Sequence, residues 1–115
     1  MTEPDLQHLP KSATHILIAI GPNELHGYAI MSEIERITDG LVRVGPGTLY
    51  TSIKRLIDAG LLEESGERPD PSVDDERRRY YRLTTAGLDA ARVELKRLRS
   101  LVAAADAWAA PEGRT

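Results

Sequence analysis

The chain has 115 residues and a mass of 12.7 kDa, which is the size of a single folding domain. Hydrophobic residues make up 41% of it and charged residues 29%, so neither a disordered nor a fibrous chain is expected. The 15 basic and 18 acidic residues give a net charge of −3, which taken alone argues weakly against a nucleic-acid partner. The absence of cysteine excludes a disulfide framework and a thiol nucleophile, and it fits a cytoplasmic location.

Membrane proteins and enzymes are disfavoured by what the sequence lacks. The longest apolar run, residues 16–20, is far shorter than the roughly 20 residues that span a bilayer, and no signal peptide is recognisable. His8, His15 and His26 lie in different predicted elements, without the spacing of a metal site, and there is no phosphate-binding glycine loop. We therefore expect a soluble cytoplasmic protein that is not an enzyme and has no catalytic residues, metal or cofactor.

The charges are distributed unevenly. Residues 1–40 carry two basic and six acidic residues, whereas residues 41–60 carry three basic residues and one acidic residue. Acidic residues dominate again from 63 to 76, and Arg77, Arg78 and Arg79 follow. Such separation gives one face its own electrostatic field whatever the net charge is, although a well-solvated surface of mixed sign would also fit.

Two short amphipathic helices are predicted first. Ser12 caps an apolar stripe over residues 13–20 that stops at Gly21, and a turn over residues 22–24 leads to a second helix over 26–38. The apolar face of the second helix holds Ile30, Met31, Ile34 and Ile37.

A third helix is predicted from Pro46 to Ala59, because proline is favoured in the first helical turn and Gly60 supplies a left-handed stop. The spacing directs inward Leu49, Ile53, Leu56 and Ile57. It directs outward Thr48, Thr51, Ser52, Lys54 and Arg55. Hydroxyls and cations presented together can bind phosphates and base edges, and Gly45 and Gly47 let a phosphate approach the helix N-terminus. A solvated helix face is the alternative for each residue taken singly.

A β-hairpin and a long helix complete the chain. Strands are predicted at residues 61–65 and 78–83, and prolines and acidic residues predict irregular structure over 66–73. Thr84 or Thr85 caps a final helix that continues to about residue 110. A heptad seam runs along it through Leu88, Ala91, Leu95, Leu98, Val102, Ala105 and Ala109, widened by Leu101 and Trp108. We expect this seam to pair with a second copy, the alternative being a helix packed wholly within its own chain.

Four short motifs in this order resemble the PadR family of bacterial transcriptional regulators over about residues 13–109. These motifs are Leu25-His26-Gly27-Tyr28, Gly47-Thr48-Leu49-Tyr50, Gly60-Leu61-Leu62, and Arg79-Tyr80-Tyr81-Arg82-Leu83-Thr84 with Gly87. The resemblance implies the smaller branch of the family, with one C-terminal helix. It also implies a cytoplasmic homodimer that represses a nearby promoter and is released by a small molecule. The fold class is then mainly α with a small β-hairpin (α+β), namely a winged helix-turn-helix followed by a long dimerisation helix.

The resemblance also assigns roles along the chain. Residues 1–84 form the DNA-binding domain with a wing at about 61–83, residues 85–110 the dimerisation helix, and residues 111–115 a tail. It implies DNA contacts by Gly47, Thr48, Tyr50, Thr51, Lys54 and Arg55 of the third helix, with Tyr50 on a phosphate. It implies basic contacts at the base of the wing by Arg77, Arg78 and Arg79. Tyr28 is a phosphate contact or, as an alternative, a buried ring bracing the second helix, and Tyr80 and Tyr81 pack within the strands.

Three expectations follow for partners. The first is double-stranded operator DNA bound by a homodimer at a near-palindrome; a winged-helix interaction module without DNA affinity is the alternative. The second is dimerisation through Leu88, Ala91, Leu95, Leu98, Leu101, Val102, Ala105 and Trp108, with Trp108 in dimer packing or, alternatively, stacking a ligand. The third is a small aromatic or drug-like effector at an unknown site. The acidic wing tip, with Asp70, Asp74, Asp75 and Glu76, departs from the family pattern: either it points away from DNA, or Arg68 and the three arginines neutralise it.

Overall fold

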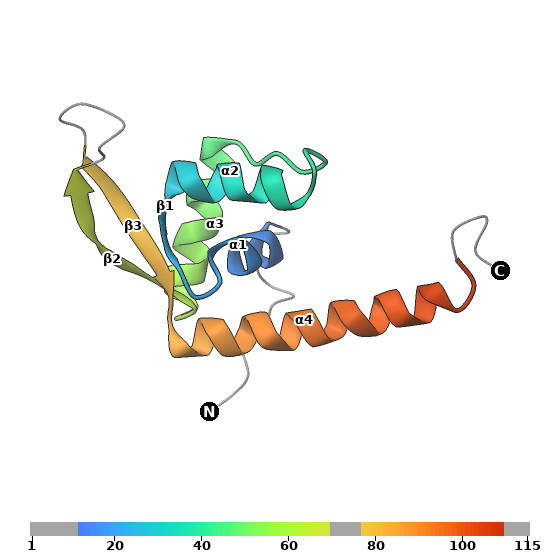
Figure 1. The fold of residues 1–115 in the computed structure, drawn as a ribbon. Helices are drawn as coiled ribbons and strands as arrows, with labels where there is room; N and C mark the ends of the chain where they lie inside the picture. The colour runs from blue at the N-terminus through green and yellow to red at the C-terminus, as the bar shows by residue number, and fades with distance from the viewer. Residues whose placement is uncertain (1–11, 70–76, 110–115) are drawn as a thin grey trace.

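The computed structural model describes residues 12–69 and 77–109, and within them are four helices and a small antiparallel sheet whose hairpin extends to one side of the helices (Figure 1). The elements are α1 (Ala13–Ile20), β1 (Glu24–His26), α2 (Gly27–Ile37), α3 (Pro46–Asp58), β2 (Leu62–Pro69), β3 (Arg77–Leu83) and α4 (Thr85–Asp106). This is the expected α+β winged helix with a long C-terminal helix. None of the described helices is both long and apolar enough to cross a membrane.

The sheet has three strands in the order β1-β3-β2, so β3 is its middle strand. The sequence predicted only the hairpin, and it placed Glu24 in a turn. In the structure Glu24 pairs with Arg82 and His26 with Tyr80, both on β3. Because β1 has only three residues, it shows no periodic pattern of its own, and its strand conformation depends on pairing with residues far along the chain.

Strand β2 is longer than predicted and continues to Pro69 through the segment expected to be irregular. A β-bulge between Glu64 and Gly66 absorbs one extra residue, and Gly66 has a φ of +135°, which residues with a side chain rarely adopt. Pro69 is tolerated because β2 lies at an edge of the sheet. The predicted tip acids Asp70, Asp74, Asp75 and Glu76 lie outside the described residues.

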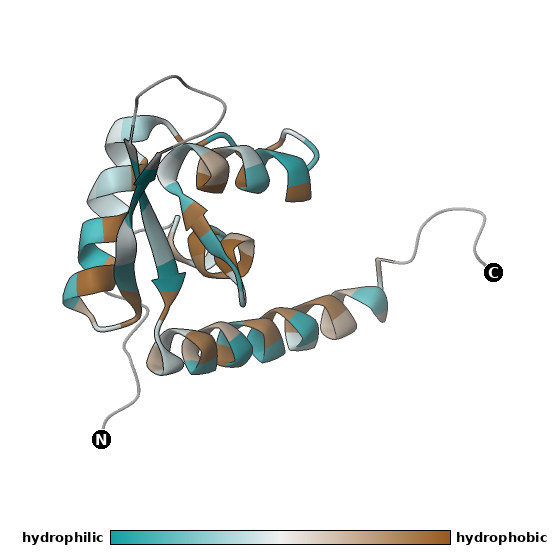
Figure 2. Ribbon diagram, turned by 60° about the vertical axis from the view of Figure 1, so that its left-hand side comes forward, coloured by the Kyte–Doolittle hydropathy of each residue, from teal (hydrophilic) through white to brown (hydrophobic). Residues whose placement is uncertain are grey.

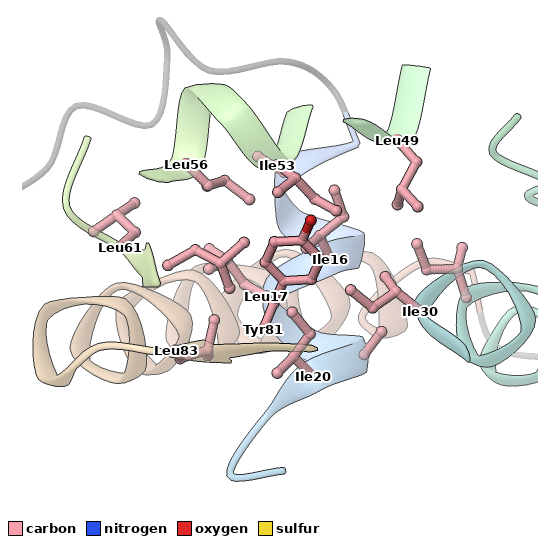
Figure 3. Packing of buried hydrophobic residues seen from close by; sticks show 14 of the residues in the cluster. Ile16, Leu17, Ile20, Ile30, Leu49, Ile53, Leu56, Leu61, Tyr81 and Leu83 are labelled. Carbon is pink, nitrogen blue, oxygen red and sulfur yellow. The ribbon is translucent and has the colours of Figure 1, made fainter. Parts of the chain in front are cut away.

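The hydrophobic core lies where α1 crosses the other elements (Figure 3). Ile16, Leu17 and Ile20 of α1 are fully buried there. Around them lie Ile30 and Ile34 of α2, Leu49, Ile53 and Leu56 of α3, Leu61 and Leu62, and Tyr81 and Leu83 of β3. The core thus holds α3 at a set position relative to the wing and leaves the other side of α3 to solvent.

Two predictions about helix faces were wrong. Ile57, expected to point inward, is 37% exposed, whereas Ser52, expected to point outward, is 1% exposed. With about 100° between successive residues of a helix, position 52 lies closer than 57 to the middle of the stripe formed by Leu49, Ile53 and Leu56. The Ser52 hydroxyl is satisfied there by a hydrogen bond with the Ser12 hydroxyl, so Ser12 does not cap α1 with its side chain as predicted.

Helix α4 begins at the junction of the wing and the core. The Thr84 hydroxyl accepts a hydrogen bond from the backbone N–H of Gly87 (3.0 Å) and donates one to the carbonyl of Gly60 (2.6 Å), so Thr84 is the N-cap. Only Gly87, Ala90 and Glu94 of this helix are buried, all of them in its first half. The chain's own core therefore covers only the start of the predicted heptad seam.

Tyr81 offers a test of the core through its ionisation. Burial raises the pKa of its phenol above the usual value of 10.0, with the nearby Tyr50 and Glu64 adding to the effect. Because the unfolded chain then loses this proton first, the free energy of unfolding should fall as the pH rises through about 10 toward the higher folded pKa. We expect the Tyr81→Phe variant to show a shallower fall in chemical denaturation measured between pH 8 and pH 11. An identical pH dependence in both proteins would contradict a buried neutral phenol.

Candidate nucleic-acid interface

The outward side of α3 presents hydroxyls and cations to solvent. Exposed along it are Gly47, Thr48, Tyr50, Thr51, Lys54 and Arg55, the residues predicted for DNA contact on this helix. Among the described residues, neither Lys54 nor Arg55 takes part in an ion pair, so both charges are open to a partner. Arg55 lies seven positions after Thr48, which is about two helical turns, or about 10 Å along the axis.

The N-terminus of α3 is open. Gly45 is its N-cap residue, no side chain caps it, and Pro46 occupies the first turn. A methyl group added at Gly45 or Gly47 would meet nothing within 4 Å, so no part of the described chain covers this end. The unpaired backbone N–H groups and the positive end of the helix dipole are therefore accessible to an anion.

Tyr50 joins α3 to α2. Its ring is 48% exposed, and its hydroxyl lies so close to Gly27 that a methyl group there would overlap it. Gly27 is the first residue of α2, and the preceding His26 caps this helix by accepting a hydrogen bond at Nδ1 from the Ala29 N–H (3.1 Å). The absence of a side chain at Gly27 is what allows Tyr50 to lie across the start of α2.

Tyr28 lies in the first turn of α2 and is 59% exposed, so the alternative of a buried bracing ring is wrong. The guanidinium carbon of Arg78 lies 5.7 Å from the centre of its ring, within range of a cation–π interaction. The contact joins a residue of β3 to one at the start of α2. It places an exposed phenol and a cation side by side beside the sheet.

The three arginines predicted at the base of the wing lie instead at its outer end, because Arg77 starts β3 and pairs with Pro69 at the end of β2, and they do not form one group. Successive residues of a strand point to opposite faces, so Arg78 lies on the outer face of the sheet with Tyr80, and Arg79 lies on the inner face with Tyr81. Arg79 is 3.9 Å from Glu64 at the nearest nitrogen and oxygen, which partly offsets its charge. Arg77 begins β3, and its side chain lies outside the described part of the chain.

A recess that the sequence did not indicate lies beside Tyr28. It has a volume of about 680 Å³ and is lined by residues of α1, β1 and α2 together with Arg78. On its α2 side Arg36 forms a two-pronged ion pair with Glu33 (2.7 Å for each bond), which lowers the pKa of that carboxyl. The recess depends on the position of β1, so no local pattern could have revealed it.

Comparison with known proteins places the chain in a family. Residues 16–93 match the model of the transcriptional regulator PadR-like family, which covers more than half of the chain. This chain belongs to the PadR-like family of transcriptional regulators. The family match ends within α4 at residue 93, just before Glu94, the last buried residue of that helix.

Individual relatives agree with this family. Transcriptional regulator Rv3488 of Mycobacterium tuberculosis is 44% identical over 73 residues, which are 64% of this chain and 62% of that regulator. RosR of H. salinarum has a TM-score of 0.61 and 28% identity, over 93% of this chain and all of that one. The structure of Bacillus subtilis PadR in complex with operator DNA has a TM-score of 0.63 and 21% identity. It matches 74% of this chain and 46% of that chain, and at this identity the likeness shows the fold alone.

Proposed function

We propose that this PadR-like regulator binds operator DNA, with α3 in the major groove and the wing against the flanking backbone. The observation that carries the proposal is the face of α3 described above, where Lys54 and Arg55 are exposed and form no ion pair among the described residues, on a helix whose N-terminus is open. Phosphate and base edges are the partners that such a face suits. The fold shared with Bacillus subtilis PadR, whose structure contains operator DNA, supports DNA as the partner.

The contacts then divide by chemistry. On α3 we assign Lys54, Arg55 and Tyr50 to phosphates. Thr48 and Thr51 are assigned to base edges or phosphates. Gly47 has no side chain, so it lets the DNA backbone approach the start of the helix closely. At the wing we assign Arg77, Arg78 and Arg79 to the flanking backbone, with Tyr28 beside Arg78 as a further phosphate contact. The net negative charge of the chain does not oppose this binding, because the α3 region is locally basic.

We further propose a homodimer. Residues 1–84 form the DNA-binding part and residues 85–110 the dimerisation helix, through Leu88, Ala91, Leu95, Leu98, Leu101, Val102, Ala105 and Trp108. Figure 2 shows hydrophobic residues recurring along α4 beyond the part that lies against the rest of the domain. In this stretch Leu101 is 54% exposed, Val102 59% and Trp108 82%, and a second copy of the helix would cover them. Two α3 helices spaced about 34 Å apart would then read a near-palindromic operator.

As a regulator of this kind, the dimer would repress the promoter beside its own coding region and be released by a small aromatic or drug-like effector. We assign Trp108 to dimer packing rather than to effector stacking, because it continues the exposed apolar line of Leu101. The effector site is left unassigned.

The test is fluorescence anisotropy with a labelled duplex carrying that promoter region, at two salt concentrations. Replacing Lys54 and Arg55 together by alanine should weaken binding and reduce the slope of log affinity against log salt by roughly one per lost phosphate contact. The matched control is Lys96→Ala, because Lys96 is also exposed but lies on α4. No binding by the wild-type chain even at low salt would reject DNA recognition and favour a winged-helix interaction module.

A further inference from the structure

The outer face of the sheet carries an ion pair that crosses all three strands. Nη2 of Arg68, on β2, lies 2.5 Å from Oε1 of Glu24, on β1, although β3 runs between these two strands. On its way Arg68 covers Tyr80 of β3, with 4.2 Å from the guanidinium carbon to the ring centre. The Tyr80 ring in turn meets the His26 ring edge to face, with 5.4 Å between the ring centres. One side chain thus joins both edge strands over the middle one.

The β-bulge makes this contact possible. Before the bulge Glu64 pairs with Tyr81, and after it Gly66 pairs with Tyr80 and Arg68 with Arg78. In an uninterrupted ladder Arg68 would instead pair with Arg77 and point to the inner face, because a shift of one residue reverses every side chain of a strand. The bulge therefore brings Arg68 to the face that carries Tyr80 and Glu24. Gly66, with its φ of +135°, supplies the backbone conformation that this requires.

The ion pair acts on the part of the wing that carries the proposed DNA contacts. Arg68 lies directly opposite Arg78, the residue over the Tyr28 ring, and Glu24 is in the strand that leads into α2. His26, which touches Tyr80, caps the same helix. Fastening Arg68 to Glu24 therefore holds the outer half of the wing against the start of α2, where Tyr28 lies.

We propose that Arg68 is a positioning residue, which sets the angle of the wing through Glu24 and Tyr80, and that it does not itself bind a phosphate. Its guanidinium is already engaged by a carboxylate and an aromatic ring, whereas Lys54 and Arg55 form no ion pair among the described residues. This inference rests on the proposed DNA-binding function, because operator affinity is the property that the wing angle controls.

The decisive variant is Glu24→Gln, because an effect of local charge and an effect of wing position would change its DNA affinity in opposite directions. Removing an acidic group would tighten DNA binding if only the local charge mattered. If Arg68 positions the wing, Glu24→Gln should weaken binding, by about three- to tenfold for an exposed ion pair with a cation–π contact. Asp89→Asn is the matched control, because it breaks another exposed pair, Asp89–Arg92 on α4, and should leave affinity unchanged.

Arg68→Ala supplies a second measurement that separates positioning from phosphate contact. We expect weaker binding with an unchanged salt slope, partial rescue in Arg68→Lys, and a Glu24→Gln/Arg68→Ala double variant no weaker than Arg68→Ala alone. Tighter binding by Glu24→Gln, or a slope lower by about one in Arg68→Ala, would overturn the proposal.

The protein without DNA provides a separate readout. Both single variants should shift the NMR signals of the Tyr80 and His26 rings while the circular dichroism stays that of the wild type. Unmoved ring signals would show that the ion pair does not hold these rings, whether or not the chain binds DNA. If the variants shift these ring signals but the wild-type protein binds no DNA, only the proposed DNA-binding function is rejected.

Discussion

Replacing Gly87 by alanine should destabilise the protein by about 3 kcal/mol and lower its melting temperature by roughly 10 °C. Gly87 lies in the first turn of α4, and a methyl group at its Cα would overlap the backbone carbonyl oxygen of Leu61 and press on Leu83. That carbonyl accepts a hydrogen bond from the Thr84 N–H (3.1 Å), so it cannot move away without loosening the junction of the wing and α4. The stability lost through this overlap should exceed the roughly 1 kcal/mol by which alanine is favoured over glycine inside a helix.

The control for this prediction is Gly47→Ala, which makes the same change inside another helix. Gly47 lies in the first turn of α3, and an added methyl group would meet nothing within 4 Å. This variant should therefore be as stable as the wild type or more stable by up to about 1 kcal/mol. Both variants can be compared by thermal and chemical denaturation followed by circular dichroism. A Gly87→Ala protein as stable as the Gly47→Ala protein would contradict the close approach of α4 to Leu61.

Placing charges on the exposed apolar face of α4 should abolish the proposed dimer. The variant with Leu101→Glu and Val102→Glu puts two carboxylates where a second copy of the helix would pack, and burying unpaired charges is costly. Sedimentation velocity should show a dimer for the wild type and a monomer for the variant. Because a monomer can bind only one half-site at a time, operator affinity should fall by a factor of roughly 10² to 10⁴.

Ser100→Glu is the matched control for the dimer. Ser100 is exposed and lies on the opposite side of α4 from Leu98 and Val102, so a carboxylate there should leave the dimer intact. The emission of Trp108, the single tryptophan of the chain, should report the same equilibrium, changing on dilution of the wild type but not of the monomeric variant. A wild-type monomer would refute the dimer. Quenching by planar compounds at a constant oligomeric state would instead assign Trp108 to ligand stacking.

Tertiary contacts overturned several local predictions. Ser12 is a residue type that commonly caps helices, yet its hydroxyl forms a hydrogen bond with that of Ser52, which lies 40 residues later on α3. Glu24 reads as part of a turn, yet it lies in a strand, because β3 pairs with it. From its local sequence Arg68 is predicted to be a loop residue that could neutralise acidic neighbours, yet it forms an ion pair with Glu24 across the sheet. In each case the partner is distant in the sequence, and nothing in the local pattern points to it.

What the sequence by itself determined was local. The spacing of apolar residues and the proline and glycine at its ends predicted α3, and with it the exposure of Thr48, Thr51, Lys54 and Arg55. The heptad spacing likewise predicted an apolar seam on α4 that the chain's own core covers only in part. Helical periodicity is imposed by the backbone within a few turns, so it can be read without knowing the rest of the fold.

The tertiary structure decided how these elements are held together. The register of β2 depends on a single extra residue at the bulge, which determines whether Arg68 faces the core side or the outer side of the sheet. The approach of α4 to Leu61, and that of Tyr50 to Gly27, depend on whole elements packing at close range. Such contacts result from strand pairing and from close packing between segments that are distant in the sequence. Neither produces a periodic pattern of residues along the chain.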